Sequence, residues 1–66
     1  MAFYEIEIVL IEYLKLIGDN KLTKYILTRF YAITFICNDN QFLLNKIKKL
    51  FMFLSVEEFQ IFLIHF

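Results

Sequence analysis

A chain of 66 residues can form one small domain at most, and its seven basic and seven acidic residues cancel to a net charge of zero. This neutral balance gives no general attraction to nucleic acid or to an anionic membrane. Apolar residues make up 61% of the chain, whereas a domain this small buries only about 60% of its unfolded surface. The apolar excess therefore predicts that a second surface covers part of the protein.

Two clear polar breaks divide the chain, GDN at residues 18–20 and NDN at residues 38–40. Gly18 can adopt the left-handed conformation that ends a helix, and Asp19 or Asn20 can cap the helix that follows. We expect the two asparagines of NDN to have the same two roles around the second break.

The first segment, residues 2–17, has an apolar stripe with spacings of three and four residues. The stripe consists of Phe3, Ile6, Leu10, Tyr13 and Ile17. This spacing predicts a helix, and further apolar residues outside the stripe give the segment a second apolar face. The alternative is a strand over 3–11, because glutamate and isoleucine alternate there, but the uninterrupted length favours a helix.

The second segment, residues 21–37, also has helical spacing. Its stripe consists of Leu22, Ile26, Phe30, Ile33 and Cys37. Residues 25–37 are nevertheless rich in β-branched and aromatic side chains, which favour strands. Propensity is the weaker of the two signals, so the periodicity predicts a helix here as well.

The third segment, residues 41–54, is the clearest helix. One face is apolar and consists of Leu43, Leu44, Ile47, Leu50, Phe51 and Leu54. The opposite face is polar, with a basic cluster of Lys46, Lys48 and Lys49. Phe42, Met52 and Phe53 lie on this polar side, where they are expected to be exposed in a monomer.

The last segment begins at a third break with a capping box, SVEE. The Ser55 side chain can accept from the amide of Glu58, whose carboxylate can accept from the amide of Ser55. Residues 59–66 are then apolar on almost every side, which is typical of a helix buried in something. We expect one side to pack on the chain's own core: Phe59, Phe62, Leu63 and Phe66. We expect the other side to meet a second copy, with an interface made of Ile61, Ile64, Phe53 and Phe42.

Catalytic and metal-binding residues are scarce. The chain has one serine, one histidine and one cysteine, and the serine is expected to be a cap. Cys37 and His65 alone supply neither a nucleophile with a base and an orienting group nor the four ligands of a zinc site. The glutamates of the first segment are expected on a solvated face: Glu5, Glu7 and Glu12. We therefore expect no enzymatic activity, no metal and no cofactor.

Charge is segregated along the chain. Residues 1–17 carry a net −2, residues 18–50 a net +4 and residues 51–66 a net −2. An acidic first helix can thus lie beside a basic third one, within a chain or between copies. The basic cluster is a possible contact patch for nucleic acid, although a solvated helix face is the commoner role of three lysines.

These patterns predict an all-α fold over residues 1–66, a single domain with three or four short helices in a compact bundle completed by homo-oligomerisation. The expected function is that of a non-enzymatic interaction protein, a homodimer that binds and modulates an unidentified protein or other macromolecule. The alternatives are a membrane-associated amphipathic helix within 41–66 and a nucleic-acid-binding dimer. No uncharged run reaches the ~18–20 residues of a transmembrane span.

The expected setting is the cytoplasm, because the chain has a single cysteine and its first charges are acidic, unlike those of a secretory signal. Frequent Ile, Phe, Lys and Asn, with no Pro and one Gly, indicate an AT-rich gene. Such a gene fits a phage, a virus or a mobile element.

Overall fold

The computed structural model describes residues 2–66, which form four helices. They are α1 (Phe3–Ile17), α2 (Asn20–Ile36), α3 (Gln41–Phe53) and α4 (Val56–His65). No strand occurs in this part of the chain, so the all-α prediction is confirmed and the strand alternatives over 3–11 and 25–37 are wrong. The radius of gyration, 11.3 Å, is close to the roughly 11 Å expected of a compact domain of this size.

The first break works as predicted. Gly18 has a φ of 75°, a left-handed conformation that only glycine adopts without strain, and its amide donates to the Leu14 carbonyl oxygen over 3.1 Å. Nothing lies within 4 Å of where a Cβ would stand, so the backbone conformation alone requires glycine at this position. The Asp19 carboxylate caps α2 by accepting from the amide of Leu22 over 3.0 Å.

The second break works only in part as predicted. Asn40 caps α3, since its side-chain oxygen accepts from the amide of Leu43 over 3.1 Å. Asn38, however, does not end α2 in a left-handed conformation, because no residue other than glycine in 2–66 has a positive φ. The helix ends at Cys37 instead, and a turn closed by a 2.9 Å bond from the Asn40 amide to the Cys37 carbonyl oxygen follows.

The capping box at the start of α4 is confirmed in both directions. Ser55 Oγ accepts from the Glu58 amide over 3.1 Å, and the Ser55 amide donates to Glu58 Oε1 over 3.0 Å. These hydrogen bonds with Ser55 lower the pKa of the Glu58 carboxyl. The start of α1 uses half of the same arrangement, because the Ala2 amide donates to Glu5 Oε1 over 3.2 Å.

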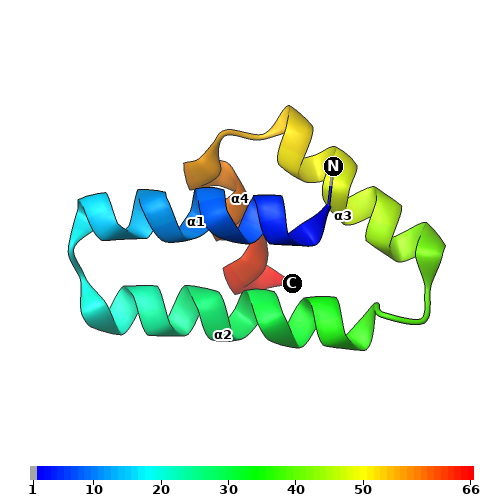
Figure 1. Cartoon of the computed structure of the whole chain (residues 1–66), viewed down its shortest axis with the longest axis horizontal. Coiled ribbons are helices and arrows are strands. Elements are labelled where there is room, and N and C mark those ends of the chain that lie inside the picture. The colour runs from blue at the N-terminus through cyan, green and yellow to red at the C-terminus, as the bar shows by residue number, and fades with distance from the viewer. Residues whose placement is uncertain (1) are drawn as a thin grey trace.

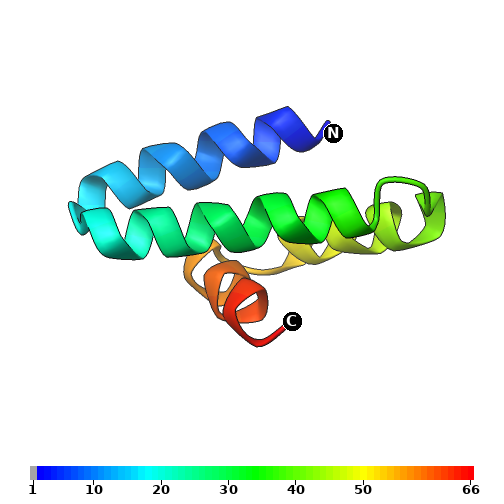
Figure 2. The same ribbon diagram turned by 90° about the horizontal axis from the view of Figure 1, so that it is seen from below.

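Helices α1 and α2 form an antiparallel hairpin, and α4 crosses it between the two (Figure 1). The view turned by 90° places α3 and α4 on the same side of this hairpin (Figure 2). Helix α2 makes the most extensive contacts, with α4 and with α1, and α3 packs on α4. One face of the hairpin is therefore covered by the second half of the chain, and its other face is not.

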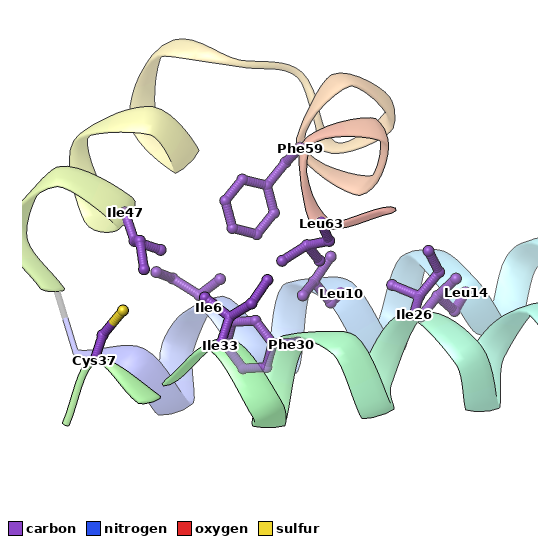
Figure 3. Packing of buried hydrophobic residues seen from close by; sticks show 10 residues of the cluster. All are labelled: Ile6, Leu10, Leu14, Ile26, Phe30, Ile33, Cys37, Ile47, Phe59 and Leu63. Carbon is purple, nitrogen blue, oxygen red and sulfur yellow. The ribbon is translucent and has the colours of Figure 1, made fainter. Parts of the chain in front are cut away.

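All four helices contribute to the core in Figure 3. Its buried residues are Ile6, Leu10, Leu14, Ile26, Phe30, Ile33, Cys37, Ile47, Phe59 and Leu63. The predicted stripe of α2 is confirmed, but that of α1 turns to Leu14 after Leu10. Tyr13 is only half-buried, and its hydroxyl donates to Glu57 Oε1 over 2.9 Å, a bond that raises the pKa of Tyr13. Ile17 at the helix end is exposed.

The buried side of α4 differs from the prediction. Phe59 and Leu63 are fully buried as expected, but Gln60 joins them with 8% exposure, while Phe66 is exposed. Ile64, expected to point away from the core, is half-buried and packs against it. The reason is that α4 crosses the hairpin instead of lying along it. The buried part of its circumference is therefore wider than predicted and is rotated toward Gln60 and Ile64.

Gln60 lacks a hydrogen-bond partner for its buried side-chain nitrogen, Nε2. A buried amide without a partner costs about 1–3 kcal/mol. We therefore expect Gln60→Met, which keeps the side-chain length, to raise the free energy of unfolding by about 1 kcal/mol or more. Urea unfolding followed by circular dichroism measures this. Gln60→Glu, which buries a charge instead, serves as the control and should be less stable; a Gln60→Met protein no more stable than the parent would contradict the assignment.

Ser55→Ala removes the oxygen that accepts from the Glu58 amide. Loss of an N-cap costs about 0.5–2 kcal/mol, and we expect the urea midpoint to fall accordingly. Ser55→Asp, which retains an acceptor at the same position, should keep most of the stability. Equal midpoints for Ser55→Ala and the parent would show that the cap does not stabilise α4.

Candidate functional site

The most distinctive surface feature is a shallow aromatic groove on the uncovered side of the α1–α2 hairpin. Two adjoining depressions, of about 400 Å³ and about 190 Å³, share Phe3, Tyr31 and Thr34 as lining residues. Tyr4 and Glu7 border the smaller depression, and Phe35, Asn38 and Leu44 border the larger one. We call this feature the hairpin groove; it lies between the first half of α1 and the second half of α2, and Leu44 of α3 lines one end of it.

The groove is part of a longer apolar strip. Residues spaced by three or four positions share one side of a helix, so two rows line the uncovered side of the hairpin. The rows are Tyr4, Ile8, Ile11 and Lys15 on α1, and Lys24, Leu27, Tyr31 and Phe35 on α2. We call these eight residues the hairpin face. Tyr4, Tyr31 and Phe35 are 64%, 46% and 83% exposed, so the aromatic rings face solvent.

The polar groups of the groove are few. The Glu7 carboxylate interacts with the Tyr31 hydroxyl, and this raises the pKa of Tyr31. The Thr34 hydroxyl donates to the carbonyl oxygen of Tyr31 over 3.0 Å within α2. Lys48 of α3 places its Nζ 5.2 Å from the centre of the Phe3 ring. The groove thus offers aromatic surface with one carboxylate at its edge, an arrangement suited to contact with another molecule.

The residues considered for catalysis or metal binding are not brought together with others of their kind. Cys37 is buried at one end of the core, as Figure 3 shows, and His65 is exposed at the end of α4. Within residues 2–66, no three histidine, cysteine or carboxylate side chains are placed to hold a metal ion. Ser55 is engaged in its cap.

Helices long and apolar enough to cross a membrane are absent from residues 2–66.

The residues expected to form the interface are spread over the surface. Phe42, Phe53 and Ile61 are exposed, and Ile64 is half-buried against the core. Phe42 and Phe53 stand eleven positions apart on α3, which is about 16 Å along the helix axis. The Nζ of Lys46 also lies 4.6 Å from the centre of the Phe42 ring. Their role as an interface remains a prediction.

The three lysines of the basic cluster do not share one side of α3. At 3.6 residues per turn, Lys46 and Lys48 lie about 200° apart around the helix, and only Lys46 and Lys49 share a flank.

The two hydrogen bonds between side chains in residues 2–66 join Tyr13 to Glu57 and Gln41 to Asn45. None therefore joins an acidic helix α1 to a basic helix α3 within the chain.

The fold and the groove define a small four-helix protein whose exposed surface suits contact with another apolar surface. Comparison with known proteins gives no matching family model, no significantly similar curated protein and no significantly similar solved structure. The assignment of a function therefore depends on the geometry of the protein itself.

The hairpin face was not predicted from the sequence, although a second apolar face on the first segment was. The sequence does contain a signal for it, a second pair of rows spaced 4, 3 and 4 on α1 and 3, 4 and 4 on α2. Each row alone resembles the ordinary exposed flank of a helix. Only the packing of α1 on α2, with Tyr31 beside Glu7, brings the two rows to one face.

Proposed function

We propose that this is a non-enzymatic interaction protein that acts as a homodimer and modulates another macromolecule. One observation supports self-association above all: fifteen large apolar side chains are exposed in the described residues, whereas ten apolar residues form the buried core. Scattered exposed apolar residues are ordinary, but a chain that exposes more of them than it buries gains much by covering them. The absence of net charge removes the repulsion that would otherwise keep copies apart.

A second observation favours contact with a membrane surface as an alternative. Phe42, Lys46, Lys49 and Phe53 follow one another at spacings of 4, 3 and 4 along α3, and all four are exposed. Basic side chains flanked by aromatic ones are found on helices that lie in the interface of an anionic membrane. This row is on the outside of α3, and it leaves the hairpin face free.

The homodimer is tested by the mass of the protein in solution. Size-exclusion chromatography with light scattering, at micromolar concentration and without detergent, should give twice the 8.1 kDa of the chain. Apolar burial drives the association, so the mass should persist in high salt. A mass of one chain over the whole concentration range would contradict the homodimer.

Contact with membranes is tested by co-sedimentation with lipid vesicles. If the α3 row binds lipid, the protein should sediment with phosphatidylserine vesicles. Lys46→Glu/Lys49→Glu should weaken this binding at least about 30-fold, because each basic residue contributes about 1 kcal/mol near such a surface and the variant reverses both charges. Vesicles of phosphatidylcholine alone are the control. Equal binding by the parent and the variant would exclude the α3 row as the contact.

A further inference from the structure

The hairpin face lies on the side of α1 and α2 that faces away from α4. Figure 2 shows α3 and α4 together on the other side of the hairpin. At its middle, Ile8 is exposed, while Ile11 and Leu27 are half-buried. The face runs across two antiparallel helices, an arrangement on which a second two-helix layer can pack.

Three aromatic side chains of the face supply about half of the area that a dimer requires. A stable interface buries about 800 Å² on each partner. An aromatic side chain buries about 150–250 Å², so the exposed fractions of Tyr4, Tyr31 and Phe35 alone present about 400 Å². Ile8 and the stems of Lys15 and Lys24 extend the same surface.

Charge is distributed unequally along this face. Glu7 lies at the open end of the hairpin, beside Tyr31. Lys15 and Lys24 lie toward the other end, where Gly18 and Asp19 connect the two helices. Among the residues of α1 and α2, one end of the face is thus acidic and aromatic and the other is basic. Lys48 of α3 reaches the Phe3 ring at the edge of the acidic end.

This polarity selects one of the two ways to stack the faces. A twofold axis parallel to the helices would place Glu7 beside Glu7 of the other copy and would gather the lysines of both copies. A twofold axis across the helices reverses the second hairpin end for end and places each basic end on an acidic, aromatic end. Opposite charges and cation–π contacts favour the second arrangement, and like charges disfavour the first.

We propose that two copies of this chain dock through their hairpin faces, related by a twofold axis that crosses α1 between Ile8 and Ile11 and α2 close to Leu27. The inference rests on the proposed homodimer and specifies its interface. Lys15 of each copy then lies over Tyr4 and Glu7 of the other, and Lys24 lies over Tyr31. The four helices of the two hairpins form a bundle, with α3 and α4 of each copy on its outer sides.

The substitution Ile8→Glu tests the interface. Because the axis passes close to Ile8, this change places two carboxylates next to each other in a surface that would otherwise be apolar. Each buried isoleucine contributes at least about a factor of ten to association, so we expect a dimer dissociation constant at least about 100-fold higher. Ile8 is exposed within one chain, so the helical circular dichroism should be unchanged.

Two matched controls carry the same change elsewhere. Leu16→Glu alters an equally apolar side chain on the same helix, 86% exposed but outside the hairpin face. Ile61→Glu alters the exposed face of α4, the interface expected from the sequence. Analytical ultracentrifugation should find both controls as tight as the parent. A parent dimer that Ile8→Glu leaves intact would overturn the hairpin interface, whereas a monomeric parent would overturn the homodimer itself.

Charge exchange tests the direction of the two hairpins. In the proposed arrangement Lys15→Glu places a carboxylate opposite Glu7, and we expect the dimer to weaken about 3–10-fold at low salt. The double variant Glu7→Lys/Lys15→Glu restores opposite charges at the same contact and should recover most of the affinity. A Lys15→Glu protein as tight as the parent, or a double variant weaker than Lys15→Glu, would overturn the end-for-end arrangement.

Discussion

The structure depends on how one short helix closes a two-helix hairpin. Helix α4 crosses the inner face of α1 and α2 and inserts Phe59, which has no exposed surface, against the ring of Phe51, with the two ring centres 5.1 Å apart in an edge-to-face arrangement. The guanidinium Nε of Arg29 donates to the Leu63 carbonyl oxygen over 3.0 Å and ties the end of α4 to α2. Small domains bury a limited share of their surface. In this chain, the buried apolar core lies on the face of the hairpin that α4 crosses.

Features set by a few neighbouring residues could be predicted from the sequence. The four helices, the left-handed Gly18 and the capping box of Ser55 depend on local backbone geometry and on side chains within one turn. Asn38 is the exception. It was predicted to end α2 in a left-handed conformation, but the helix is capped at Cys37, one residue earlier.

Features set by distant neighbours could not be predicted. The rotation of α4, which buries Gln60 and exposes Phe66, follows from its crossing of the hairpin. The change from Tyr13 to Leu14 in the stripe of α1 follows from the packing of α1 in the core, where Leu14 is fully buried, while Tyr13 bonds to Glu57, a residue far away in the sequence. The hairpin face has the same origin, since its two rows become one surface only when Glu7 and Tyr31 meet. Periodicity identifies which residues share a side of a helix, but it does not indicate what that side packs against.

The contact between α2 and α4 has a kinetic consequence, because α3 separates these two helices along the chain. The hairpin is a local structure that can form early, whereas its closure waits for a segment twenty residues further on. During that interval the hairpin is apolar on both sides, and such an intermediate is prone to aggregate. The capping box at Ser55 lies entirely within the first turn of α4, so it can stabilise this helix before the helix docks on the hairpin.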